Sequence, residues 1–120
     1  MTSKLLIAGS RTIMHNIDHI LDNASYIFDV PFEVVIIGGA RGVDESGRKW
    51  ALNKGYETVL MPADWDRYGK RAGYLRNIEM NKLCTHAIVV WDGASRGAEM
   101  MIEVLEQSLK PHVVVKLYET

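Results

Sequence analysis

Three glycine-rich segments follow apolar stretches of this chain. They are Gly9-Ser10-Arg11, the run from Gly38 to Asp44 and the run from Asp92 to Gly97. A glycine-rich turn between a strand and a helix lets backbone N–H groups approach a ligand closely, and the helix N-terminus adds partial positive charge. Each segment also carries an arginine, whose planar guanidinium suits phosphate oxygens. We therefore expect the three segments to converge on one nucleotide-like ligand.

A fourth segment, residues 62–77, combines aromatic rings, basic side chains and glycines. Such a mixture can stack on a base while holding its phosphates. The alternative is an irregular connection in which Trp65 and Tyr68 fill the edge of the core. Connections this long in compact domains are more often functional than not. The segment is therefore predicted to form a side wall or lid of the site.

The predicted ligand-binding residues all lie in these four segments. They are Gly9, Ser10, Arg11, Gly38, Gly39, Ala40, Arg41, Gly42, Asp44, Trp65, Tyr68, Lys70, Arg76, Asn77, Asp92, Gly93, Ser95, Arg96 and Gly97. Asp44 stands at the start of a predicted helix, where capping of backbone N–H groups is the favoured role and contact with a ribose hydroxyl or Arg41 is the alternative. Asp92 can take a ribose hydroxyl or brace its turn.

Residues with catalytic or metal-binding spacing are few. Ser10 and Ser95 have no neighbouring histidine base, so phosphate or turn contacts suit them better than nucleophilic roles. Glu99 is a weak candidate for an acid or base, with complementing the helix dipole as the alternative. His15 and His19 are four residues apart without a third ligand nearby, which favours a solvated helix face over a metal site. We expect neither a metal ion nor a cofactor.

The elements that must position these residues alternate along the chain. Runs of apolar and β-branched residues predict strands at 4–8, 33–37, 57–61, 86–91 and 112–117. Helical spacing of apolar residues predicts helices between them, within 13–28 and at 44–53, 70–84 and 98–109. Pro31 ends the first helix, and Gly55 is a plausible C-cap of the second.

Strands that are apolar throughout and separated by single helices predict an α/β fold of the Rossmann-like, three-layer type. We expect a five-stranded parallel sheet in the order 3-2-1-4-5, with helices on both faces. This order places the first and fourth strands side by side, so that all three glycine-rich segments line one crevice at the carboxyl ends of the strands. The order 2-1-3-4-5 would separate those two strands and weaken the convergence.

The composition bears on the number of domains, the kind of partner, the location and the oligomeric state. A chain of 120 residues, 48% hydrophobic and 24% charged, is typical of a single domain with a real core. The formal net charge of −1 offers no general attraction to nucleic acid or to an anionic membrane. The single Cys84 and the lack of a leader or spanning segment predict a cytoplasmic protein with a buried thiol. The helix at 98–109 has apolar residues on more than one face, which predicts a homo-oligomer, a dimer or higher.

Four blocks of the sequence resemble the YspA/YpsA-related branch of the SLOG superfamily. They are Ile7 to Arg11, Gly38 to Asp44 with Trp50-Ala51, Pro62 to Asn77, and Trp91 to Gly97. The resemblance covers nearly the whole chain and implies one Rossmann-like domain over 1–120. It also implies a nucleotide-derived ligand, including signalling nucleotides used in conflicts between bacteria and phages. Relatives include the cytokinin-activating phosphoribohydrolases and the DNA-processing protein A family.

The chain departs from the phosphoribohydrolases at their catalytic motif. Aligning the later glycine of that P-G-G-x-G-T-x-x-E motif with Gly97 puts Met101 where the glutamate belongs, and the leading proline is missing. Glu99 lies two residues earlier, roughly 200° round the helix. We therefore expect a sensor or sequestering protein that binds a nucleotide or ADP-ribose-type ligand. A nucleoside-phosphate N-glycoside hydrolase is the first alternative. Single-stranded nucleic-acid binding is the second, which the near-zero net charge disfavours.

Overall fold

The computed structural model describes residues 2–118 and confirms the predicted α/β architecture. Its strands are β1 (Ser3–Gly9), β2 (Phe32–Ile37), β3 (Glu57–Leu60), β4 (His86–Trp91) and β5 (His112–Lys116). Its helices are α1 (Asp18–Phe28), α2 (Val43–Asn53), α3 (Trp65–Tyr68), the short 3₁₀ helix η1 (Gly69–Arg71), α4 (Ala72–Leu83) and α5 (Arg96–Gln107). Most of these bounds lie within one or two residues of the predicted ones.

All strands of the sheet run parallel, in the predicted order β3-β2-β1-β4-β5. Strand β1 lies at the centre, paired with β2 on one side and β4 on the other. The carboxyl ends of these three strands therefore meet at one edge of the sheet. The segments that follow them start from neighbouring positions, as a switch point between two halves of a sheet requires.

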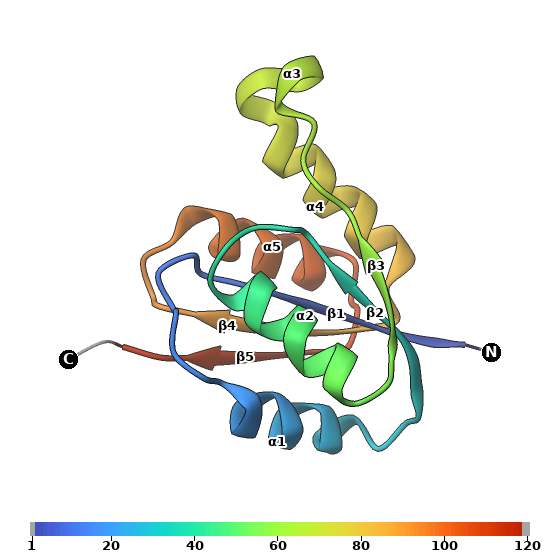
Figure 1. The fold of residues 1–120 in the computed structure, drawn as a ribbon. Coiled ribbons are helices and arrows are strands. Elements are labelled where there is room, and N and C mark those ends of the chain that lie inside the picture. The colour runs from blue at the N-terminus through green and yellow to red at the C-terminus, as the bar shows by residue number, and fades with distance from the viewer. Residues whose placement is uncertain (1, 119–120) are drawn as a thin grey trace.

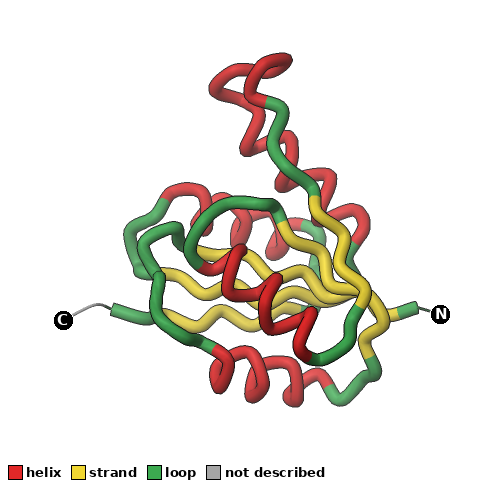
Figure 2. Tube along the Cα trace, viewed as in Figure 1, coloured by secondary structure: helices red, strands yellow, loops and turns green. Residues whose placement is uncertain are grey.

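Helices cover both faces of the sheet, which makes three layers (Figures 1 and 2). On one face, Leu21 of α1 and Trp50 of α2 pack with Leu5, Ile7 and other strand residues in one buried cluster. On the other face, Met80 of α4 and Met101 and Leu105 of α5 pack in a second cluster. The alternation of side chains along each strand supplies both clusters, because successive residues point to opposite faces.

The first helix begins later than the apolar spacing predicts. Ile13 and Ile17 are buried with the α1 face of the core, yet both precede the helix, which begins at Asp18. Asn16 Oδ1 accepts the Asp18 N–H at 2.8 Å, and Thr12 Oγ1 donates to Asp92 Oδ2 at 2.6 Å. These side-chain bonds hold residues 10–17 as a loop across the sheet edge. The isoleucines fill the core without helical backbone.

The helix predicted over 70–84 is present as α4, and the segment before it folds into two short helices, α3 and η1, that the spacing did not predict. Asp64 Oδ1 accepts the N–H of Arg67 and caps α3. Gly69 follows with φ of +57° and ψ of −132°, a conformation that a side chain would oppose and that stops α3 from continuing into α4.

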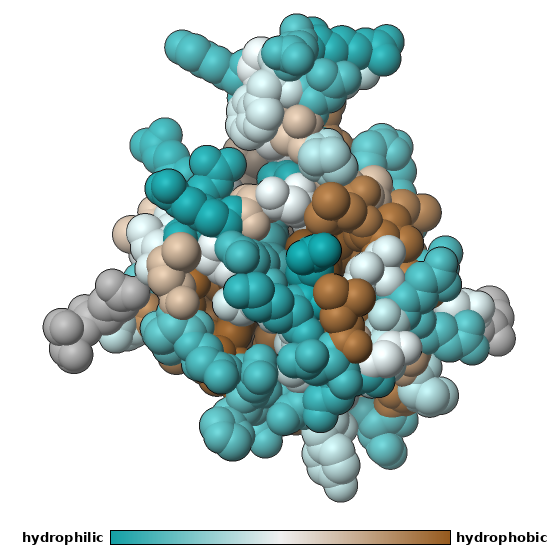
Figure 3. Space-filling view, in the orientation of Figure 1, coloured by the Kyte–Doolittle hydropathy of each residue, from teal (hydrophilic) through white to brown (hydrophobic). Residues whose placement is uncertain are grey.

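Residues 62–75 form an arm that projects from the body of the protein, with α3 at its tip (Figures 1 and 2). Every residue from 64 to 71 is exposed. Figure 3 shows hydrophobic surface where the arm leaves the body near β3, whereas the tip is mostly hydrophilic. Leu60 of β3 is 55% exposed and Trp65 of α3 is 51% exposed. The arm therefore contributes little to the core and offers an aromatic ring beside the sheet edge.

Two further features bear on the sequence predictions. Cys84 is buried, as expected, and burial raises the pKa of its thiol. Within residues 2–118, no helix has the length and apolar character needed to cross a membrane.

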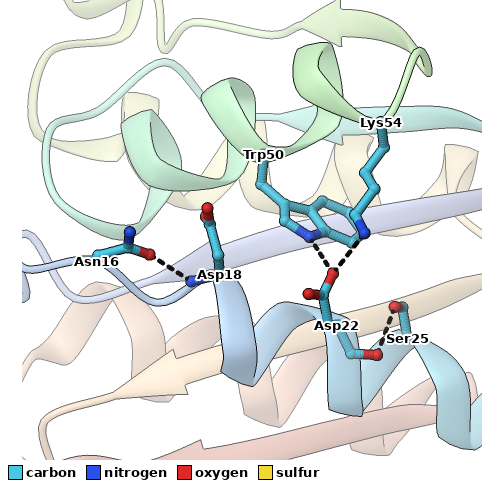
Figure 4. Close-up of polar contacts among 6 residues, drawn as sticks. All are labelled: Asn16, Asp18, Asp22, Ser25, Trp50 and Lys54. Atoms are coloured by element: carbon cyan, nitrogen blue, oxygen red, sulfur yellow. Dashed lines mark hydrogen bonds and ion pairs between the residues drawn. The ribbon is translucent and has the colours of Figure 1, made fainter.

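A polar contact joins α1 to α2 on the face away from the arm. Figure 4 shows the carboxylate of Asp22 between Trp50 and Lys54. Its Oδ1 accepts the indole N–H of Trp50 at 2.8 Å and lies 3.0 Å from Lys54 Nζ. Trp50 is only 3% exposed, so its N–H depends on this acceptor.

Replacing Asp22 with alanine is expected to lower the free energy of unfolding by about 1–2 kcal/mol, because the Trp50 N–H loses its partner. The matched variant Lys54→Met removes only the exposed ion pair and should have a clearly smaller effect. Urea denaturation followed by circular dichroism measures both. Equal losses in the two variants would contradict the assignment of the stabilisation to the indole bond.

Candidate ligand-binding site

Ser10 joins the three glycine-rich segments at the sheet edge. Its backbone N–H donates to Val90 O at 3.0 Å, and its carbonyl accepts the N–H of Val43 at 3.3 Å. Its hydroxyl oxygen accepts the Asp92 N–H at 2.9 Å. The side chain is almost fully buried. Ser10 therefore fixes the spacing between the segments after β1, β2 and β4, a positioning role that sequence spacing alone could not reveal.

Asp92 braces the turn between β4 and α5. Its Oδ1 accepts the N–H groups of Ala94 at 2.8 Å and Ser95 at 2.7 Å. Its Oδ2 accepts the hydroxyls of Thr12 at 2.6 Å and Ser95 at 2.7 Å. These bonds, led by the one from Thr12, hold the pKa of Asp92 well below its usual range. The two predicted roles of Asp92 were contact with a ribose hydroxyl and bracing of its turn, and in the structure its carboxylate braces the turn.

The three segments and α4 enclose a cavity of about 360 Å³ at the carboxyl ends of β1, β2 and β4, here named the arginine cavity. Arginines reach it from separate elements: Arg11 from the segment after β1, Arg76 from α4 and Arg96 from the start of α5. Of the predicted residues, it is lined by Gly9, Ser10, Arg11, Ala40, Asp44, Arg76, Asn77, Ser95, Arg96 and Gly97. The predicted convergence on one cavity is therefore present.

The N-terminus of α5 opens into the same cavity. Ser95 is its N-cap residue, but its side chain makes no capping bond, because its hydroxyl donates to Asp92 instead. Gly97 and Ala98 line the cavity, and a Cβ added at Gly97 would meet nothing within 4 Å. The first backbone N–H groups of α5 are thus open to a ligand, and the helix dipole favours an anionic one.

Asp44 is the carboxylate that the structure places in this cavity. The side chain is 6% exposed, and its Oδ2 accepts the Ala40 N–H at 3.0 Å. Burial raises its pKa to about 6, against the lowering effects of the Ala40 bond and of the charges on Arg76 and Arg11. The bond to Ala40 braces the glycine-rich loop and is not the predicted helix cap, because Ala40 precedes α2 and the N-terminus of α2 has no side-chain capping bond.

Arg76 of α4 is hydrogen-bonded to the glycine-rich loop that follows β2. Its Nη1 donates to Gly38 O at 2.5 Å and to Met61 O at 3.4 Å, while its Nε donates to Asn77 Oδ1 at 3.1 Å. Burial lowers its pKa, opposed by the charge on Asp44. A Cβ at Gly38 would lie 2.7 Å from Arg76 Nη1, so the loop has room for this contact only with glycine there. Arg76 is a positioning residue that also lines the cavity.

A second hollow of about 450 Å³ adjoins the arginine cavity and is here named the Trp65 hollow. The two share Arg11, Ala40 and Arg76. Its other predicted residues are Gly38, Gly39, Arg41 and Trp65. Trp65 is half exposed and lies over Gly73 of α4. The arm thus forms a side wall, with the aromatic ring of Trp65 beside the shared arginines.

The structure does not bring every predicted residue to these two spaces. Gly42, Asp92 and Gly93 shape the loops but line neither space. Tyr68 and Lys70 lie towards the tip of the arm and also line neither. Their contact with a ligand stays a prediction.

Sequence reasoning missed the apolar lining of the arginine cavity. Ala8, Met80, Ala98 and Met101 contribute to its wall. The alignment with the phosphoribohydrolase motif did signal Met101, which is buried and lines the cavity at the position expected for the glutamate. Glu99, the weak catalytic candidate, is exposed and does not line this cavity. The structure thus supplies a thioether rather than a carboxylate on this side of the site.

Comparison with known proteins identifies one phage relative and one protein family. The Gene 61 protein of Mycobacterium phage D29 is 37% identical to this chain over 83 residues. The match covers 64% of this chain and 66% of the phage protein, so the chain spans just under two thirds of that relative's length. No solved structure matches the chain. The family described as YspA, cpYpsA-related SLOG matches residues 3–68, from β1 to the end of α3. On this match over more than half of its length, the chain belongs to the YspA, cpYpsA-related SLOG family.

Proposed function

We propose that this protein binds a nucleotide or ADP-ribose-type ligand at the C-terminal edge of its sheet, as a sensor or a sequestering protein. The observation that carries the proposal is the uncapped N-terminus of α5, which opens into a cavity lined by Arg11, Arg76 and Arg96. Backbone donors and guanidinium groups converging from separate elements are a typical anion cradle. Membership of the SLOG family supports a nucleotide-related ligand.

The ligand's phosphates would lie at the N-terminus of α5, between Arg11 and Arg96. The remainder would extend past Arg76 into the Trp65 hollow, where the indole can stack on a base. Trp65 is half exposed, so stacking would cover apolar surface that is now open to solvent. The two adjoining spaces suit a ligand with one strongly anionic part and one aromatic part.

Binding is proposed rather than N-glycoside hydrolysis because of the residues on α5. Met101 lines the cavity and has no proton to exchange, while Glu99 is exposed outside it. Because this relative is a phage protein, the proposal includes a role in conflict between bacteria and their viruses. The ligand would then be a signalling nucleotide.

Native mass spectrometry of gently purified protein, looking for a bound small molecule, is the direct test. Thermal shifts with mononucleotides, ADP-ribose and cyclic nucleotides then identify the class, because a ligand that binds only the folded state raises its stability. A protein that none of these compounds stabilises, and that carries no bound molecule, would contradict the proposal. Release of free base from a nucleotide would instead support the hydrolase alternative.

Arg11→Gln and Arg96→Gln are each expected to weaken binding of the stabilising nucleotide about 10-fold or more, since each removes a charge-assisted bond to phosphate. Both side chains are exposed, so the fold should tolerate the changes. Arg71→Gln is the matched control, because Arg71 is exposed in η1 and lines neither space. Isothermal titration calorimetry measures all three. Equal weakening by the control would indicate a general charge effect.

We also propose that the protein forms a homo-oligomer. On α5, Met101 and Leu105 are buried against the sheet, while Met100, Ile102 and Val104 are only partly buried. This residual apolar surface is the support for the proposal. Size-exclusion chromatography with light scattering tests it, and a monomeric mass at high concentration would contradict it.

A further inference from the structure

Asp44 holds a carboxylate at an unusual place for an anion-binding cavity. Only 6% of the residue is exposed, and it lines the arginine cavity from the first turn of α2. The hydrogen bond that the structure records for it reaches Oδ2, from the Ala40 N–H. Among the described residues, no fully buried side-chain polar atom lacks a partner. The other oxygen, Oδ1, for which the structure records no partner, therefore keeps some exposed surface on a side chain that lines the arginine cavity.

The charges around Asp44 do not neutralise it by direct pairing. Arg76 and Arg11 act on it through space, but none of the ion pairs within 4.0 Å in residues 2–118 involves it. Arg76 is bonded to Gly38, Met61 and Asn77 instead. The cavity thus combines arginine side chains with a carboxylate that none of them pairs directly.

These two properties restrict the kind of ligand. A ligand made only of phosphate oxygens satisfies the arginines but is repelled by the carboxylate and leaves Oδ1 without a donor. A ligand that carries phosphate and a hydroxyl on the same small framework satisfies both. The cavity volume of about 360 Å³ is near the lower end of small-molecule sites, so the two groups must lie close together. A pentose phosphate meets this description.

We propose that Oδ1 of Asp44 accepts a hydrogen bond from a pentose hydroxyl of the ligand, so that the site selects ribonucleotides over deoxyribonucleotides and bare phosphate. This inference rests on the proposed function of the same cavity. It makes Asp44 a specificity-determining residue in addition to a brace for the loop. It also separates the site from one that binds single-stranded DNA, whose sugars lack the 2′-hydroxyl.

The test compares AMP, 2′-deoxy-AMP, 3′-deoxy-AMP and inorganic phosphate by isothermal titration calorimetry at pH 8. Removing the recognised hydroxyl is expected to weaken binding about 10- to 100-fold, the usual effect of losing a hydrogen bond to a charged group. In Asp44→Asn, the amide oxygen can keep the Ala40 bond while the amide NH₂ faces the cavity. The amide NH₂ can still donate to the hydroxyl oxygen, but this bond is neutral, so the preference for the ribonucleotide should fall about 10-fold, with phosphate binding unchanged or tighter.

Glu45→Gln is the matched control. Glu45 is the next residue of α2, is exposed and pairs with Lys49 on the helix surface at 3.4 Å. It should keep the full preference. The wild-type comparison of ribo- and deoxynucleotides needs no variant, so the test does not depend on the folding of Asp44→Asn.

The outcomes separate the two proposals. Equal binding of AMP and both deoxynucleotides would leave the proposed function standing and overturn the inference about Asp44. A preference that is undiminished in Asp44→Asn, or that is lost in Glu45→Gln, would also overturn it. Failure of all four compounds to bind would overturn the inference about Asp44, whereas the proposed function is overturned only if ADP-ribose and the other nucleotides also fail to stabilise the protein.

Discussion

The Asp44→Asn variant is expected to be more stable than the wild-type protein at pH 8, by about 3 kcal/mol. Burial raises the pKa of Asp44 from its ordinary value of 3.8 to about 6, and each pKa unit corresponds to about 1.4 kcal/mol. An asparagine has no charge to desolvate and can keep the bond to the Ala40 N–H. The carboxylate therefore destabilises the folded protein, which is the usual sign of a group that serves a ligand.

The sign of the pH dependence follows from the direction of this shift. Between about pH 4 and pH 6 the folded state holds a proton on Asp44 that the unfolded chain has released, so the contribution of Asp44 to stability falls as the pH rises through this window. Below it both states are protonated, and above it both are ionised. The stability difference between variant and wild type should grow from near zero at low pH to its full value above pH 6.

Urea denaturation of both proteins at several pH values between 4 and 8 measures this difference, since other titrating groups cancel in the comparison. Glu45→Gln is again the control and should show little change, because its carboxylate is exposed. A difference that stays constant with pH would show that Asp44 is not buried as described. A less stable variant would show that the charge on Asp44 supports the loop.

Replacing Gly42 with alanine is expected to destabilise the protein by about 3 kcal/mol or more. Gly42 has φ of +74° and ψ of −125°, a conformation outside the left-handed helical region that costs an L-residue on the order of 1–3 kcal/mol. Its added Cβ would also lie 2.5 Å from Ser10 O and 2.7 Å from Arg11 Cα. Both atoms belong to backbone that Ser10 ties to the neighbouring segments, so they cannot move aside cheaply.

Gly55→Ala measures the cost of a positive φ without the close contact that a Cβ at Gly42 would make. Gly55 has nearly the same φ, +83°, but a Cβ there would meet nothing within 4 Å. Its cost should be about 1–2 kcal/mol, from backbone strain alone. Thermal and urea unfolding of the two variants measure the contrast. Similar losses would mean that the close approach of the loops at Gly42 is not needed for folding.

The fold was predictable from the sequence because its signals are local. The strands β2 and β4 are runs of β-branched and apolar residues, and their single-helix spacing dictates parallel pairing. The prediction failed where long-range contacts replace local preference. Ile13 and Ile17 have helical spacing but lie in a loop held by Thr12 and Asp92, which are far apart in the sequence.

The sequence predicted where the candidate site lies better than it predicted the roles of the individual residues. Arg11 and Arg96 line one cavity, because strands β1 and β4 are neighbours and their following segments must meet. The positioning role of Arg76 was not predictable, and for Asp92 the sequence left turn bracing and ribose contact both open. Arg76 donates hydrogen bonds to the carbonyls of Gly38 and Met61. Asp92 accepts hydrogen bonds from the hydroxyls of Thr12 and Ser95.

By itself, the sequence determined the α/β fold, the strand order and the edge of the sheet at which the glycine-rich segments meet. The fold follows from periodicity and from the rules of parallel sheets, and the strand order is preferred over 2-1-3-4-5 because it brings the three glycine-rich segments to one crevice. Only the tertiary structure decided that Asp44 is buried among arginines, that Met101 lines the cavity and that the α5 N-terminus is uncapped. Burial, electrostatic environment and competing hydrogen bonds depend on residues that the fold brings together from distant positions, so no local pattern encodes them.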